Sequence, residues 1–148
     1  MSLHELKELK KIRNRRMEQQ LAEMQEKRRQ VDGYTQQLQQ AKTELNNYQH
    51  WRLEQQEARF KALQSQPFTP EALREYQGQL ENMLMQEQFY YQAITAAETQ
   101  LKASETALQT SKQKSDQMTL QFEKMKEIVD IEAKAVALAN SEDRAPDP

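Results

Sequence analysis

The sequence contains no cysteine, only two glycines and only four prolines in 148 residues. The lack of cysteine excludes disulfides, thiol catalysis and metal sites built on thiolates. The scarcity of glycine and proline leaves few positions at which the chain can reverse its direction. Because a compact domain needs several reversals to enclose a core, this composition favours two or three very long helices.

Long apolar runs are also missing. No stretch reaches the roughly 18 apolar residues that a transmembrane helix needs, so we expect no membrane insertion. The first residues are charged and form no apolar signal core, so no secretory signal is predicted. We therefore expect a cytoplasmic protein.

Charge is distributed unevenly along the chain. Residues 1–30 contain nine Lys or Arg and five Glu, a net charge of +4, so the rest of the chain carries −6 of the total of −2. Six of these cations lie close together: Lys7, Lys10, Lys11, Arg13, Arg15 and Arg16. Such a cluster fits docking on an acidic protein surface, and equally a solvated face paired with nearby glutamates. Nucleic acid is disfavoured as a partner, because no aromatic residue for stacking lies near and the total charge is negative.

One strong break interrupts the helical pattern, where Pro67 and Pro70 cannot both continue a helix. Thr69 can cap a new helix, Pro70 suits its first position, and Glu71 favours the positive end of its dipole. The break therefore separates two helices.

The predicted organisation is one helical hairpin over residues 1–140. Helix one spans about residues 3–64, the tip spans 65–69, and helix two spans about 70–140. At the rise of an α-helix these helices are about 90 and 105 Å long. Residues 141–148 are polar and contain two prolines, so we expect a disordered tail.

The second helix carries two rows of residues at seven-residue spacing. The first row is Leu73, Leu80, Glu87, Ile94, Leu101, Leu108, Ser115, Phe122, Val129 and Val136. The second row is Tyr76, Met83, Tyr90, Ala97, Ser104, Ser111, Met118, Met125, Glu132 and Ala139. A period sustained this far indicates a left-handed coiled-coil seam, in which we expect Leu101 and Leu108 to be buried.

The first helix repeats this spacing less regularly. One row is Met17, Met24, Val31, Leu38 and Leu45, with Tyr34, Ala41 and Tyr48 at partner positions. Toward the tip the apolar residues are Leu53, Phe60 and Leu63, which we interpret as a stutter in the repeat. Asp32-Gly33 is a weak point, since glycine inside a helix costs about 1 kcal/mol relative to alanine. We expect a bend there at most.

The short tip makes the two helices antiparallel neighbours. Residue numbers of facing pairs should then sum to about 135 to 139, because the reversal lies near residue 67. This register places Val31 near Ser104, and Arg52 near Glu87, so that two charges in the seam offset each other. The predicted fold class is all-α, a long two-helix antiparallel coiled-coil hairpin, and we expect a monomer.

No constellation of residues indicates catalysis. His4 and His50 are isolated, and Gly33 and Gly78 stand alone, so no glycine-rich loop can hold a phosphate. A pair of helices offers no concave pocket in which carboxylates would be desolvated. We predict that the protein is not an enzyme and has no catalytic, cofactor-binding or metal-binding residues.

Aromatic residues concentrate on both sides of the predicted tip. They are Tyr48, Trp51, Phe60, Phe68, Tyr76, Phe89, Tyr90 and Tyr91. A two-stranded seam buries only two positions in each repeat, so we expect Trp51, Phe89 and Tyr91 to be partly exposed. These side chains either form a protein-binding surface or cover the edges of the seam.

The order of these features resembles a known family. A basic first helix, a proline-marked tip and a heptad-bearing second helix are similar to the central stalk proteins of type III secretion, the YscO-like proteins of virulence injectisomes, which are related to flagellar FliJ. The local marks are Leu45-Asn46-Asn47-Tyr48-Gln49 before the tip and Tyr76-Gln77 after it. The general run of the N-terminal segment and the tip resembles the injectisome member more than the flagellar one. Arg52 and Gln79 stand where the flagellar relative has aromatic residues, so the resemblance supports the ATPase contacts more strongly than the gate contacts.

This resemblance implies a role and two contact regions. It implies a non-enzymatic stalk or adaptor at the cytoplasmic face of the secretion apparatus, which links the hexameric secretion ATPase to the export gate and promotes ATPase assembly and activity. Some members of the family also bind secretion chaperones and so recycle them. The ATPase contact would involve Lys7, Lys10, Lys11, Arg13, Arg15, Arg16, Val129 and Val136, with the three arginines mostly off the seam. The export-gate or chaperone contact would involve Leu45, Tyr48, Trp51, Tyr76, Leu80 and Met83.

Two other classes of function fit the same residues. One is a purely structural coiled coil that scaffolds an assembly, and the other is a holdase-like chaperone that grips clients between its helices. Binding to the cognate ATPase separates the stalk from both, and an assay of client aggregation detects the holdase.

Overall fold

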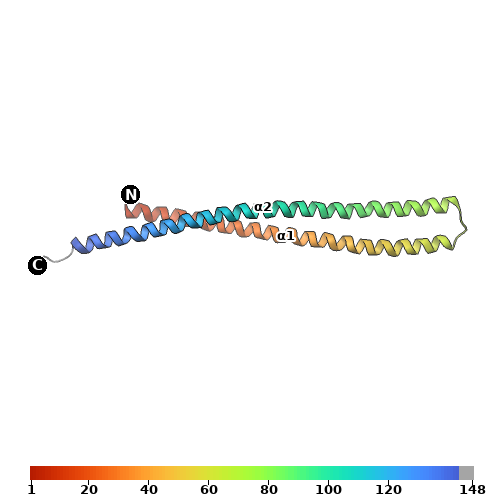
Figure 1. Ribbon diagram of the computed structural model, residues 1–148, viewed down its shortest axis with the longest axis horizontal. Coiled ribbons are helices and arrows are strands. Elements are labelled where there is room, and N and C mark those ends of the chain that lie inside the picture. Colours follow the sequence, from red (N-terminus) through yellow and green to blue (C-terminus); the bar gives the residue numbers. More distant parts are fainter. Residues whose placement is uncertain (144–148) are drawn as a thin grey trace. The chain divides into compact units, whose positions relative to one another are not determined.

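The computed structural model describes residues 1–143, which form two helices and no strand (Figure 1). Helix α1 spans Leu3–Gln64 and helix α2 spans Pro70–Asp143. The predicted bounds of the first helix and the start of the second are confirmed. Helix α2 ends three residues beyond the predicted position, so residues 141–143 are helical. The rest of the predicted tail lies outside the described residues.

Capping side chains begin both helices. Ser2 Oγ accepts a hydrogen bond from the Glu5 amide at 3.2 Å, and Thr69 Oγ1 accepts one from the Ala72 amide at 3.1 Å. These bonds satisfy amides that have no partner within the first turn of a helix. The cap at Thr69 agrees with the sequence prediction, and it ends the tip by starting α2 at Pro70.

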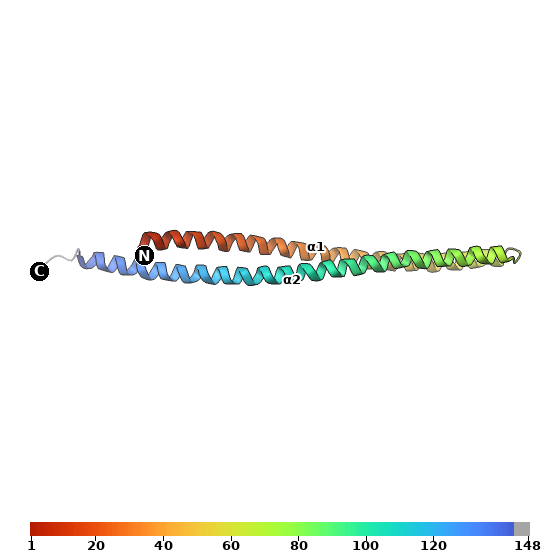
Figure 2. The same cartoon turned by 90° about the horizontal axis from the view of Figure 1, so that it is seen from above.

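The chain divides into two units. The tip unit comprises residues 30–105, and the terminal unit comprises residues 1–29 with 106–148. In the tip unit the α1 and α2 segments lie side by side and join at the tip (Figures 1 and 2). Tyr48 stacks on Tyr90 at 4.7 Å between ring centroids, and Phe60 lies 6.3 Å from Tyr76. Because the residue number rises on α1 as it falls on α2, the helices of this unit are antiparallel.

The terminal unit has the same antiparallel arrangement. Arg13 Nη1 donates a hydrogen bond to the Gln121 carbonyl at 3.4 Å, and Gln20 Nε2 donates to Ser111 Oγ at 3.2 Å. Moving along α1 from residue 13 to 20 therefore moves backward along α2. Each unit is thus a pair of antiparallel helices, as the sequence predicts.

The two rows predicted on α2 are its inner face. Every member of the first row is buried or half-buried, and in the second row only Ala139 is exposed. Leu101 and Leu108 are half-buried, and the prediction that they are buried is wrong. A single partner helix covers only one side of an inner position, so many side chains there keep contact with solvent. The most covered side chains at the inner positions of α2 include Ser115, at 2% exposed, and Met83 and Met125, at 4% each.

On α1 the inner row continues toward the tip, and of the three residues of the predicted stutter only Leu63 is half-buried. The seven-residue step from Leu45 leads to Arg52 and Arg59, which are both half-buried. Leu53 and Phe60 are instead 56% and 47% exposed. The helix thus keeps its spacing and places arginines at inner positions, where the long apolar stems pack and the charged ends reach water or a carboxylate. Helix α1 also runs unbroken through Asp32-Gly33.

Candidate functional site

Tyr48 is the centre of the tip unit's packing. Its hydroxyl donates a hydrogen bond to the Met83 carbonyl at 2.7 Å and lies 3.4 Å from Gln86 Oε1. Its ring stacks on Tyr90, and the Trp51 ring lies tilted against it at 5.6 Å. Tyr48 is only 8% exposed. One side chain therefore fixes the register of α1 on α2 by both packing and a directed hydrogen bond.

Burial also changes the acidity of this phenol. Loss of hydration raises the pKa of Tyr48 above 10.0, and the negative charges of ionised Tyr90 and Glu87 add to the rise while Arg52 opposes it. The folded tip unit therefore favours the neutral phenol, which is the form that can donate to the Met83 carbonyl.

An ion pair lies in the seam beside Tyr48. Arg52 Nε lies 3.1 Å from Glu87 Oε2, with these side chains 19% and 9% exposed. The prediction that Arg52 lies near Glu87 is confirmed. Gln49 Nε2 completes the group by donating to Glu87 Oε1 at 2.9 Å and to the Tyr91 hydroxyl at 3.1 Å. Arg52 Nε lacks a well-aligned hydrogen-bond acceptor, so charge attraction holds the arginine here.

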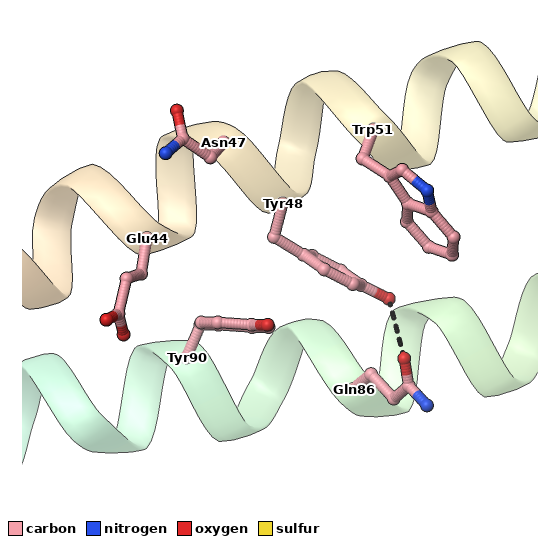
Figure 3. Close-up of a pocket in the computed structure, with 6 residues that line it drawn as sticks. All are labelled: Glu44, Asn47, Tyr48, Trp51, Gln86 and Tyr90. Carbon is pink, nitrogen blue, oxygen red and sulfur yellow. Dashed lines mark hydrogen bonds between the residues drawn. The ribbon is translucent and has the colours of Figure 1, made fainter.

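A surface cavity of about 630 Å³ opens beside the stacked tyrosines (Figure 3). It is lined by Glu44, Asn47, Tyr48, Trp51, Gln86 and Tyr90. Glu44 and Trp51 extend from α1 toward α2 on either side of Tyr48, while Asn47 points away (Figure 3). Trp51 is 42% exposed, so an indole face is available at one end of the cavity.

The residues predicted for the gate or chaperone contact differ in accessibility. Tyr48 and Met83 are buried, Leu45, Tyr76 and Leu80 are half-buried, and Trp51 is exposed. The prediction that Trp51, Phe89 and Tyr91 are partly exposed is confirmed. Sequence reasoning missed two further exposed apolar side chains, Leu84 and Met85. Their exposure could have been predicted from the sequence, because both residues lie between the inner positions 83 and 87.

The basic cluster forms a second candidate surface, in the terminal unit. Lys7, Lys10, Lys11, Asn14, Phe122 and Val129 line a cavity of about 320 Å³. The fold thus brings together three lysines and one valine that were predicted to contact the ATPase, and places Phe122 beside them. Arg15 and Arg16 are exposed but do not line this cavity. Cations lie here beside apolar side chains from α2.

Arg13, Val129 and Val136 are less exposed than the predicted ATPase contact at each of them requires. Arg13 is half-buried and bonded to the Gln121 carbonyl, so the expectation that it lies off the seam is wrong. The seven-residue step from Leu6 leads to position 13, which explains its inward place. Val129 is only 5% exposed and Val136 is half-buried. The valines pack within the terminal unit and leave little side chain for a partner.

Exposed apolar residues on the outer face of α2 were missed by the sequence analysis. They are Leu120, Ile128, Ile131 and Leu138, each between 45% and 63% exposed. Leu120 and Ile131 line a surface hollow together with three carboxylates and three lysines: Glu123, Glu127, Asp130, Lys124, Lys126 and Lys134. These positions do not belong to the two rows at seven-residue spacing, so the heptad pattern did not predict them. Exposed apolar side chains grouped on one face are typical of a surface that contacts a partner.

No other chemistry is evident in the described part of the chain. Within residues 1–143, no group of three or more His, Cys, Asp or Glu could hold a metal ion. The helices described there include none with the length and hydropathy needed to cross a membrane.

The match to a protein-family model shows the family of this chain. The model of the family described as type III secretion protein YscO matches residues 6–144 of this chain. The chain belongs to the YscO family. The resemblance drawn from the proline-marked tip and the heptad rows is therefore confirmed, and the chain is a type III secretion protein.

A solved structure supports the fold of this YscO-family chain. It is similar to the 2.8 Å crystal structure of the type III secretion protein YscO from Vibrio parahaemolyticus, with a TM-score of 0.83 and 19% sequence identity. The similarity covers 95% of this chain and 89% of that chain. No curated protein matches the chain. At this identity the likeness concerns the fold, and the roles of single residues must come from the geometry of the two surfaces.

Proposed function

We propose that this YscO-family protein is a non-enzymatic stalk or adaptor that links the hexameric secretion ATPase to the export gate at the cytoplasmic face of the apparatus. It promotes assembly and activity of the ATPase, and its tip unit contacts the gate or secretion chaperones. The protein acts as a monomer. The observation that carries the proposal is the clustering of Lys7, Lys10 and Lys11 beside Phe122 and Val129 in one cavity of the terminal unit.

The chemistry of this surface suits an acidic, partly apolar protein segment. The lysines supply attraction that speeds encounter, and Phe122 offers an apolar contact that gains by excluding water. The exposed outer row of Leu120, Ile128, Ile131 and Leu138 adds a second apolar face on the same segment of α2. Two such faces suit a helix pair enclosed by a ring better than one that is contacted from a single side.

Stimulation of ATP hydrolysis tests the proposal. A partner that binds the assembled ring more tightly than its subunits shifts the equilibrium toward the ring by mass action. The protein should therefore raise hydrolysis most at ATPase concentrations where the ring is only partly assembled. Replacing Lys7, Lys11 and Arg15 with Glu should reduce the stimulation at least about fivefold, because three exposed attractions become repulsions.

A matched control separates this site from total charge. Lys42, Arg74 and Lys112 are also exposed, and their replacement with Glu changes the net charge by the same amount. This control variant should stimulate like the parent protein. Equal loss in both triple variants, or full stimulation by the first, would contradict an ATPase contact at the basic cluster and favour a structural scaffold.

A further inference from the structure

The cavity beside Tyr48 combines aromatic rings with a carboxylate. Tyr48 and Tyr90 stack at its centre, and Trp51 and Glu44 stand at its two ends (Figure 3). The Tyr48 hydroxyl is already bonded to the Met83 carbonyl. The cavity therefore presents ring faces and an anion, which together attract a cation.

The charge of Glu44 is not offset within the described chain. Its carboxylate accepts a hydrogen bond from Gln40 Nε2 at 3.3 Å, and it takes part in no ion pair among residues 1–142. Glu87, on the neighbouring helix, is paired with Arg52. The two carboxylates near Tyr48 thus differ, since one is neutralised inside the seam and the other is exposed at the cavity.

The surrounding segments make this surface acidic. Residues 43–58 contain three Glu and one Arg, and that arginine is the partner of Glu87. Residues 75–101 contain four Glu and no Lys or Arg. The whole tip unit, residues 30–105, contains ten Asp or Glu and six Lys or Arg, a formal charge of −4, so a basic partner segment is attracted and an acidic one is repelled.

We propose that this cavity binds a lysine or arginine side chain from a basic segment of a partner protein. The charged end pairs with Glu44 beside Tyr90, the stem of the side chain lies along the aromatic residues toward Trp51, and the acidic surroundings hold the rest of the segment. The proposal deepens the role given above to the tip unit by stating the chemistry of its partner. Because its test uses purified peptides, it can fail while the ATPase role of the terminal unit stands.

Trp51 gives a local readout, since it is the single tryptophan of the chain. Its fluorescence would be followed during titration with N-acetyl-arginine methylamide and with the citrulline analogue, an uncharged isostere, at constant ionic strength. Arginine amide should change the fluorescence saturably with millimolar affinity, as a single exposed cation–π and ion-pair contact allows. Citrulline amide should produce little change.

A peptide containing three arginines alternating with glycines tests whether a segment docks there. It should bind more tightly than arginine amide, and the corresponding citrulline peptide should not bind. If the arginine peptide binds no more tightly than the single amide, segment docking is excluded. If arginine and citrulline amides behave alike, or neither is bound, the cavity only covers the edge of the seam and the proposal is wrong.

Two single variants locate the contact. Glu44→Gln keeps the shape of the cavity and removes its charge, and should weaken arginine binding about three- to tenfold. Glu54→Gln removes an exposed charge from the same helix outside the cavity, and should change binding less than twofold. Equal effects of the two variants would show that only the general acidity matters and would overturn the assignment to this cavity.

Sedimentation of the protein alone tests one further occupant. The alternative occupant is the basic cluster of a second copy of this chain. A self-association that Glu44→Gln abolishes would identify that occupant and overturn the proposal, whereas a monomer at peptide-binding concentrations supports a separate partner.

Discussion

The tip unit and the terminal unit share one spacing of inner positions but fill it with different side chains. In the tip unit the inner positions hold Tyr48, Met83 and Tyr90, together with the Arg52–Glu87 pair. In the terminal unit Gln20 faces Ser111, and Ser115 is only 2% exposed. Periodicity therefore decides that the helices pair, while the identity of the inner residues decides how strongly each unit is held.

The terminal unit contains apolar packing as well, but over a limited stretch. Met125 and Val129 are 4% and 5% exposed. Between them and the tip unit, the inner positions of α2 include two buried serines, which remove little apolar area from water. We therefore expect the tip unit to resist local unfolding more than the serine-containing part of the terminal unit.

Removal of the Tyr48 side chain should have the largest effect. Tyr48→Ala deletes two ring contacts and leaves the Met83 carbonyl without its donor, so we expect a loss of about 3 kcal/mol in unfolding free energy. Urea unfolding followed by circular dichroism measures it. Trp51→Ala, at an exposed position, should cost about 1 kcal/mol or less. Similar losses in both variants would contradict the central place of Tyr48.

The ion pair provides the next comparison. Glu87→Leu leaves the Arg52 guanidinium without its partner in the seam and should cost about 2 kcal/mol. In the terminal unit, Glu8→Leu breaks an exposed pair with Lys11 and should cost less than about 0.5 kcal/mol. The double variant Arg52→Met with Glu87→Leu should regain most of the loss, because no charge then remains unpaired. A double variant as unstable as Glu87→Leu would show that the pair contributes more than mutual neutralisation.

Loss of the hydrogen bond between Gln20 and Ser111 in the terminal unit should have a smaller effect on the unfolding free energy. Gln20→Leu or Ser111→Ala alone removes one partner of a part-buried hydrogen bond and should cost about 1 kcal/mol. The double variant should be nearly as stable as the parent, since both polar groups are replaced together. A double-mutant cycle from thermal unfolding measures the coupling. Additive losses would mean that the two side chains are stabilised by other neighbours.

The smallest effect concerns alkaline pH. The pKa of Tyr48 is raised in the folded state. The stability that the neutral Tyr48 side chain contributes is therefore fully present below pH 10.0, and it is lost as pH rises through the higher folded pKa. The stability of the parent relative to Tyr48→Phe should therefore fall above about pH 10, because phenylalanine has no proton to lose. Parallel pH profiles of the two proteins, measured by urea unfolding, would contradict this origin.

Several features followed from the sequence because they depend on local chemistry. Two prolines and a capping threonine set the tip, and seven-residue spacing set the inner face of α2. The pairing of Arg52 with Glu87 also followed, since a single tip between two straight runs leaves little freedom of register. The order of these features was sufficient to indicate the family.

The tertiary structure decided which residues at those positions are covered. The apolar pattern suggested a shift of the α1 stripe to Leu53, Phe60 and Leu63. Of these only Leu63 is half-buried, and the geometric repeat keeps Arg52 and Arg59 at inner positions. The position of a residue in the seven-residue repeat decides whether its side chain points toward the partner helix, whatever the side-chain type. An apolar residue one position after an inner residue, such as Leu53 or Phe60, therefore remains exposed. The same reason turns Arg13 inward and leaves Leu120 and Ile131 outside.

The composition of the two candidate sites depends on the pairing of the helices even more than the burial of the inner residues does. The sequence alone determined two long helices, a proline tip, a basic start and an aromatic region around the tip. Only the packed helices brought Lys7 beside Val129, and Glu44 and Trp51 beside Tyr90. Each cavity is lined by both helices, from positions far apart in sequence. Periodicity shows which face of a helix meets its partner, whereas the side chains that flank the contact are fixed only when both helices are in place.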